Sequence, residues 1–141
     1  MRAPWHLLAV GFASLLWNAM GAADYTLTQI RYAPYLSQFT PEQLAWFESF
    51  PAWVQGTWAL AVWLSVAGSL LLLLRSRHAA PCLGLSLIFL ILTFVHNFYL
   101  ADISMIEISG TWAAVFSAAI ALVAALLWLY GRWMRARGVL G

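Results

Sequence analysis

The sequence predicts an all-α fold, a transmembrane four-helix bundle with both termini on the cytoplasmic side. The first reason is composition: 64% of the 141 residues are hydrophobic and 9% are charged, whereas soluble proteins carry roughly 25% charged residues. Seven basic and five acidic side chains cannot cover a water-facing surface around so much apolar mass, so lipid must cover it. The second reason is that four apolar stretches each reach the roughly 20 residues that a helix needs to cross a bilayer.

The four spans belong to a single integral membrane domain covering residues 1–141. One longer connection separates the first two spans, and short connections separate the others. The predicted spans are about 4–23, 52–74, 81–101 and 110–130, and the longer connection is 24–51.

The positions of the arginines predict the direction in which the spans cross the membrane. Arginines lie before the first span, between the second and third, and after the fourth: Arg2, Arg75, Arg77, Arg132, Arg135 and Arg137. The other two connections hold all five acidic residues and one arginine, Arg31. Arginine on alternate connections is the positive-inside pattern. We therefore expect a multi-pass protein with cytoplasmic termini and the 24–51 connection outside.

The first span has an alternative interpretation as a cleavable signal peptide. The small residues Gly21–Ala23 before Asp24 resemble a signal-peptidase site. The length of the apolar run, together with Trp5, Trp17 and Asn18 within it, favours a retained span. The 24–51 connection lies outside in both interpretations.

The longer connection carries the start signals of a short helix. Thr40 is a good N-cap residue, Pro41 suits the first helical position and Gln43 stands at the capping-box position. Behind them, Leu44, Phe47 and Phe50 share one face with Trp46 beside it. We expect this helix to lie at the outer membrane interface.

Small residues on the fourth span predict a packing face. Two rows recur at four-residue spacing, a period that lets helix backbones approach closely in lipid. One row is Gly110, Ala114 and Ala118, and the other is Ser117, Ala121 and Ala125. The partner helix belongs either to the same chain or to another one, so a homo-oligomer or a partner membrane subunit is expected beside membrane lipid.

Polar side chains within the spans concentrate in the outer half of the predicted bundle. Such groups are costly in lipid and usually face the protein interior. All four spans bring hydrogen-bonding groups to a similar depth, and aromatic side chains flank them. The candidate ligand-binding residues of this layer are Asn18, Asp24, Tyr25, Gln55, Trp58, His96, Asn97 and Tyr99.

Two interpretations of this outer polar layer remain open. In one, the groups satisfy one another and hold the helices in register. In the other, they line an outward-facing pocket for a small polar solute. His96 is the leading candidate because it is the only histidine in a span other than His6, which lies at a helix end, and a histidine can titrate near physiological pH. If the faces of the first and third spans meet, His96 should share a cavity with Asn18.

Metal and redox chemistry have little support in the sequence. No metal-ligand spacing is present, so we expect no metal and no cofactor. A haem between His6 and His78 is a weaker interpretation, because histidines at helix ends are more often solvated. The lone Cys82 excludes an internal disulfide and a Cys-x-x-Cys pair. No catalytic set lies at one depth, so the protein is not expected to be an enzyme, nor to bind nucleic acid.

Several motifs together resemble a known group of proteins. They are Trp17-Asn18-x-x-Gly21-x-x-Asp24-Tyr25, Phe50-Pro51-Ala52-Trp53, Trp58-Ala59-Leu60-Ala61-Val62-Trp63 and the run Leu70–Arg75. They are similar to those of small four-span proteins of the bacterial inner (plasma) membrane that are often labelled sugar transporters. The resemblance covers most of the chain and implies that Asn18, Asp24 and Tyr25 belong to a site.

Two functions follow as hypotheses. The first is binding or transport of a small polar solute through the outward-facing pocket. The alternative is a non-catalytic accessory or structural subunit of a larger membrane complex, whose tryptophan-rich and small-residue faces pack against partner helices.

Overall fold

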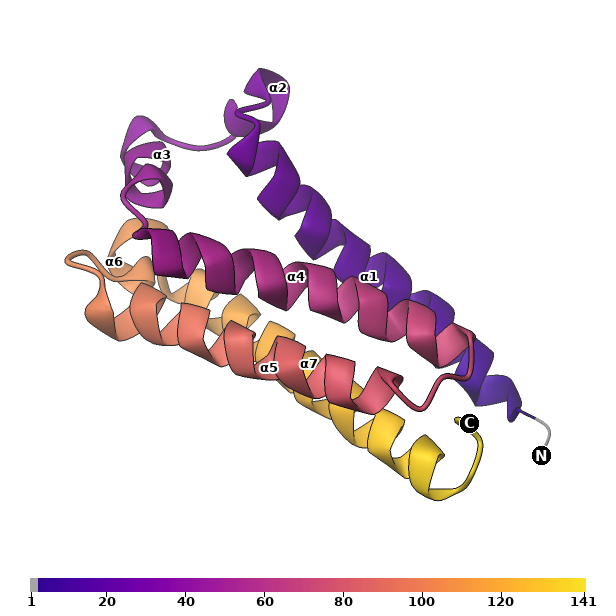
Figure 1. The fold of residues 1–141 in the computed structure, drawn as a ribbon. Coiled ribbons are helices and arrows are strands. Elements are labelled where there is room, and N and C mark those ends of the chain that lie inside the picture. Colours follow the sequence, from indigo (N-terminus) through magenta and orange to yellow (C-terminus); the bar gives the residue numbers. More distant parts are fainter. Residues whose placement is uncertain (1–2) are drawn as a thin grey trace.

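The computed structural model describes residues 3–141, and every regular element in that range is a helix (Figure 1). Four helices are long: α1 (Trp5–Gln29), α4 (Ala52–Leu73), α5 (Ala79–Val95) and α7 (Thr111–Ala136). A π-helical turn, η1 (His96–Leu100), continues α5. Short helices occupy the connections: α2 (Ala33–Leu36), α3 (Pro41–Glu48) and α6 (Met105–Ser109).

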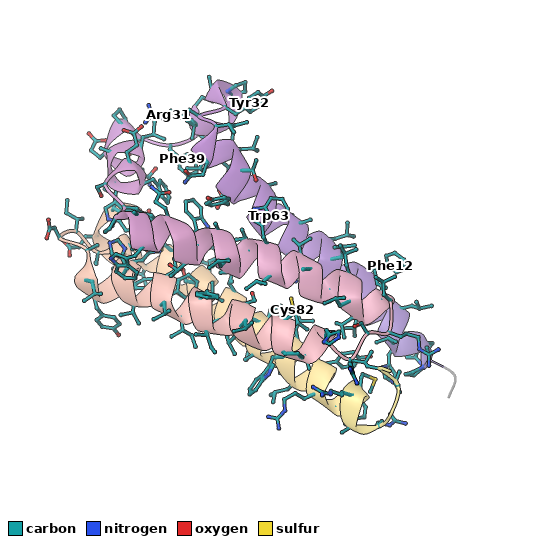
Figure 2. All side chains as sticks on the ribbon, in the orientation of Figure 1. Phe12, Arg31, Tyr32, Phe39, Trp63 and Cys82 are labelled. Atoms are coloured by element: carbon teal, nitrogen blue, oxygen red, sulfur yellow. The ribbon has the colours of Figure 1, made fainter. Side chains whose placement is uncertain are left out.

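The long helices have the length and surface of membrane spans. Counting α5 with η1, the four contain 25, 22, 22 and 26 residues and are apolar enough to cross a bilayer. Large apolar side chains stand on the outside of the molecule (Figure 2), among them Phe12 on α1 and Trp63 on α4, which are 58% and 50% exposed. This surface suits lipid better than water, and the fold is that of a multi-pass integral membrane protein.

Two of the long helices extend beyond the predicted spans. The first was expected to end near residue 23 and the fourth near residue 130, but α1 continues to Gln29 and α7 to Ala136. Polar residues that end an apolar stretch do not end a helix, because the helix satisfies its backbone groups internally. α1 and α7 therefore continue past their apolar stretches.

The long helices form a curved row rather than a closed square. α1 packs on α4, α4 on α5 and α5 on α7, whereas the backbones of α1 and α7 scarcely approach each other. The two ends of the chain lie together with the α4–α5 connection, which we call the termini end, and α2, α3 and α6 lie at the opposite end, which we call the loop end (Figure 1). Termini on one side agree with an even number of spans.

The tightest packing is near the termini end, where small residues admit a neighbouring helix. A Cβ atom added to Gly68 of α4 would lie 2.5 Å from Leu83 Cδ2 of α5, and one added to Gly131 of α7 would lie 3.4 Å from Ala80 Cα. The apolar core of this end consists of Leu7, Leu72, Ala79, Leu83, Leu127, Met134, Val139 and Leu140. The core joins all four long helices and the C-terminal segment.

At the loop end, α3 begins as predicted. The Gln43 backbone N–H donates to Thr40 Oγ1 at 3.1 Å, and the Thr40 N–H donates to Gln43 Oε1 at 3.1 Å, which completes the capping box. The main anchor of α3 is Trp46, which is buried and donates its indole N–H to the Ile103 carbonyl at 2.6 Å. α3 therefore packs on the loop before α6, and its position at a membrane interface stays a prediction.

The small-residue rows of α7 do not pack as tightly as the sequence suggested. Gly110 precedes the helix with φ of 84°, and Ala118 is exposed. Four of the row residues face α5 across a groove of about 420 Å³ rather than touching it closely: Ala114, Ser117, Ala118 and Ala121. The close approach of α5 and α7 occurs instead at Gly131, in the half of α7 that lies nearer the termini end.

Candidate functional site

A cavity of about 390 Å³ lies on the concave side of the curved row. Small-molecule sites in proteins typically have volumes of roughly 300–1,000 Å³, so this one could hold a small solute. All four long helices contribute to it, and α2 adds one side chain. The lining residues are Trp17, Asn18, Met20, Gly21, Asp24, Tyr35, Ala61, Val62, Ser65, Ser86, Leu90, Phe116, Ile120 and Ala124.

One face of α1 supplies most of the chemistry. Trp17, Gly21 and Asp24 follow each other at spacings of four and three residues, which places them on one side of a helix, and Asn18 lies beside them. A Cβ atom added to Gly21 would lie 3.8 Å from Val62 Cγ1, at ordinary van der Waals distance, so this face of α1 lies against α4. A polar face of α1 thus lies directly over the α4 surface.

Asn18 is held in one orientation by α4. Its amide nitrogen donates to the Ser65 carbonyl at 3.2 Å and to Ser69 Oγ at 2.8 Å. Ser69 is fully buried, and its hydroxyl donates onward to the Ser65 carbonyl at 3.0 Å. With both amide hydrogens engaged, the free polar atom of Asn18 is its carbonyl oxygen Oδ1.

Asp24 lies at the loop end of the cavity and is partly covered by α2. Its Oδ1 accepts a hydrogen bond from the Tyr35 hydroxyl, and within residues 3–141 no side chain donates to Oδ2. Burial, and after it the hydrogen bond and negative charge of Asp24, raise the pKa of Tyr35 above its usual range. Tyr35 is therefore a neutral donor at physiological pH and does not offset the charge of a carboxylate.

Aromatic side chains connect α1 to α7 where their backbones stay apart. Toward the loop end, the rings of Trp17 and Phe116 lie 6.2 Å apart between centroids. At the termini end, His6 Nδ1 and the Tyr130 hydroxyl are hydrogen bonded at 2.6 Å. Phe116 lines the cavity although it is 47% exposed. The cavity therefore reaches the lipid-facing surface between α1 and α7.

His96 and Asn97 form a separate cluster near α3. Both side chains are buried, with His96 Nδ1 3.1 Å from Asn97 Oδ1. The imidazole packs edge-on against Phe50 and Trp53, at centroid distances of 5.2 and 5.7 Å. Among residues 3–141 no buried side-chain nitrogen or oxygen lacks a hydrogen-bond partner, so this cluster has no buried polar atom that requires a ligand.

The expectation that His96 shares a cavity with Asn18 is wrong. Asn18 contacts α4 at Ser65, and His96 contacts it at Trp53. These two contacts are twelve residues apart, which is about 18 Å along a helix. The two side chains therefore lie at different depths. α1 continues to Gln29, so Asn18 lies deeper in the bundle than its distance from the predicted end of the first span indicated.

The other predicted site residues lie outside the cavity. Tyr25 packs edge-on against Trp58 at 4.9 Å between centroids, Gln55 Oε1 accepts from Gln29 Nε2 at 2.6 Å, and Tyr99 is 84% exposed. Of the eight candidates, Asn18 and Asp24 line the cavity. Whether any of the eight binds a ligand stays a prediction.

Sequence reasoning missed Tyr35, Phe116 and Ser86 as cavity residues. A serine within a helix commonly bonds back to its own backbone, but Ser86 donates across to the Ala61 carbonyl of α4 at 2.6 Å. Tyr35 reaches the cavity because α2 packs back against α1. No local pattern in the sequence predicts that turn of the chain. A search for aromatic residues just outside each span would have included Tyr35.

A metal centre has no set of ligands here. Within the described part of the chain, no three histidine, cysteine, aspartate or glutamate side chains come close enough to hold a metal ion.

Comparison with known proteins adds no relative: no protein-family model matches the chain, and neither a curated protein nor a solved structure matches it significantly. The functional argument therefore depends on the cavity.

Proposed function

We propose that this protein binds a small polar solute in the cavity between α1 and α7 and carries it across the membrane. The observation that supports this most is the presence of Asp24 and Asn18 in a cavity of about 390 Å³ whose other walls are mainly aromatic and aliphatic. Binding sites for small molecules commonly combine apolar walls with a few placed polar groups that fix orientation.

The cost of these polar groups also favours a site. Ionisable side chains within membrane helices are expensive and mostly serve a substrate, an ion or a proton path. Asp24 satisfies only one carboxylate oxygen with Tyr35, and Asn18 is held so that its carbonyl oxygen is left over. A solute that enters the cavity would find two acceptors already oriented, which reduces the entropy cost of binding.

The proposed setting is the bacterial inner membrane, with both termini in the cytoplasm and the loop end outside. The alternation of arginine-rich and acidic connections supports this orientation. The resemblance to small four-span inner-membrane proteins supports the choice of membrane. Asp24 would then lie toward the outer surface, where a solute arrives.

Filling the cavity tests the proposal. Ala124 lines it from α7, whereas Ala119 of the same helix is exposed and is not among the lining residues of this cavity. We expect Ala124→Phe to abolish solute binding and Ala119→Phe to leave it intact, measured by calorimetry on protein in lipid nanodiscs. The probes are 2-phenylethylamine, 2-phenylethanol, 3-phenylpropionate and methyl α-glucoside. No binding of any probe, or equal binding by both variants, would refute the proposal.

The groove between α5 and α7 favours a second candidate, an accessory subunit of a membrane complex. Its floor contains small residues, and Ala118 on its edge is exposed, as expected where another helix packs. Under this candidate Ala118→Leu dissociates an assembly that Ala119→Leu leaves intact, as measured by native mass spectrometry from nanodiscs. A monomeric wild-type protein would exclude it.

A further inference from the structure

We infer that the solute is a small protonated amine with an apolar body, whose ammonium group pairs with Asp24 and whose body lies against Trp17 and Phe116. This inference rests on the proposed function and names the class of its solute. It departs from the neutral sugar that the resemblance implies. Three properties of the cavity carry it: its charge, its hydrogen-bonding groups and its aromatic walls.

The charge of the cavity is one-sided. Among the described lining residues, Asp24 is the only carboxylic acid, and none is an arginine, lysine or histidine. The basic residue of the long connection, Arg31, is largely exposed and pairs with Glu48 at 3.8 Å. An ionised carboxylate in an apolar setting needs a nearby positive charge. The protein supplies none in the cavity, so a cationic solute would provide it, and an anion would be repelled.

The unpaired hydrogen-bonding groups of the cavity are mainly acceptors, because all but one of the side-chain donors among the described lining residues already have partners. Ser65 Oγ donates to the Val62 carbonyl at 2.7 Å and Ser86 Oγ to the Ala61 carbonyl at 2.6 Å. The amide hydrogens of Asn18 go to α4.

The Tyr35 hydroxyl goes to Asp24, which leaves the indole N–H of Trp17 as the unused side-chain donor of the described lining. Two acceptors remain, Asp24 Oδ2 and Asn18 Oδ1. A neutral sugar has several hydroxyl oxygens that need donors, whereas an ammonium group only donates.

The aromatic walls favour the same class. Trp17 and Phe116 present rings 6.2 Å apart between centroids, and Trp17 lies two helical turns, roughly 10 Å, along α1 from Asp24. An amine whose ammonium group pairs with Asp24 can therefore place its apolar body against these rings. Leu90 and Ile120 complete an apolar surface for the body of the solute.

A matched pair of probes tests the charge. 2-Phenylethylamine is cationic at neutral pH, and 2-phenylethanol has the same body with a hydroxyl in place of the ammonium. Because hydrogen bonds to a charged group are stronger than neutral ones, we expect the amine to bind roughly 10- to 100-fold more tightly in nanodiscs. Asp24→Asn should weaken the amine by a similar factor and leave the alcohol unchanged. Asp102→Asn, which removes an exposed acid outside the cavity, should change neither.

The outcomes separate this inference from the proposed function. If 2-phenylethanol or methyl α-glucoside binds as tightly as the amine, and Ala124→Phe blocks that binding, the cavity is a solute site and the cationic class is wrong. If no probe binds, both fail. If Asp24→Asn does not fold, the relative affinities of the amine and the alcohol for the wild-type protein still test whether the site prefers a cation.

Discussion

The packing of α4 on α5 predicts opposite effects for the same substitution at two glycines of one helix. Gly68 is buried, and a Cβ atom there would lie 2.5 Å from Leu83 Cδ2 and 2.6 Å from Leu83 Cγ. Gly56 has no atom within 4 Å of an added Cβ. Gly68→Ala must therefore displace Leu83, which is 2% exposed, whereas Gly56→Ala displaces nothing.

The magnitude follows from two opposing terms. Replacing glycine by alanine inside a helix stabilises it by about 1 kcal/mol, and this term is common to both positions. Inserting a methyl group into a well-packed core costs roughly 1–3 kcal/mol, and this term applies only at Gly68. The difference between the two variants isolates the second term, so we expect Gly68→Ala to be about 1–3 kcal/mol less stable than Gly56→Ala.

The assay is reversible unfolding in mixed micelles of mild detergent and sodium dodecyl sulfate, followed by circular dichroism. A double variant, Gly68→Ala with Leu83→Ala, should recover part of the loss relative to the sum of the single variants, because the clashing side chain is gone. Equal stability of Gly68→Ala and Gly56→Ala, or purely additive effects in the double variant, would refute the close approach of α4 and α5 at this level.

Three further predictions concern the cavity, the histidine cluster and the topology. Tyr35→Phe should lower the free energy of unfolding by about 1–2 kcal/mol, because a carboxylate loses its hydrogen bond, whereas Tyr32→Phe, at an exposed residue without a side-chain hydrogen bond, should not; equal stabilities in the same unfolding assay would contradict this. His96→Ala should destabilise the loop end without changing solute affinity, and a calorimetric loss of affinity in folded protein would show that the histidine takes part in binding. After Cys82 is replaced by alanine, a cysteine introduced at Ser37 should react with an impermeant maleimide added to intact cells, and one at Ser76 should not; the reverse pattern would invert the proposed orientation.

Much of the fold could be predicted from the sequence because its determinants are local. The number of spans follows from the length of apolar runs, and the start of α3 follows from the capping residues Thr40 and Gln43, which bond each other as expected. The end of α1 could not be predicted in this way. Hydropathy does not mark the continuation of α1 through Asp24, because a polar residue does not interrupt a helix whose backbone groups are satisfied internally.

The candidate site was only partly predictable for a related reason. Asn18 and Asp24 were recognised as polar groups in an apolar span, and both line the cavity. His96 was grouped with them by depth alone, but it contacts α4 at Trp53, about 18 Å along that helix from the Asn18 contact at Ser65. The order of helices and the direction of each polar face are properties of the assembled fold.

The location of bound solute tests the central claim most directly. A photoreactive aryl azide derivative of 2-phenylethylamine, irradiated with the wild-type protein in nanodiscs, can be mapped by mass spectrometry of proteolytic fragments. The account predicts labelling of residues 17–24 of α1 and 116–124 of α7, suppressed by unmodified amine and absent in Ala124→Phe. Labelling confined to the His96 cluster, or labelling that excess amine does not suppress, would contradict it.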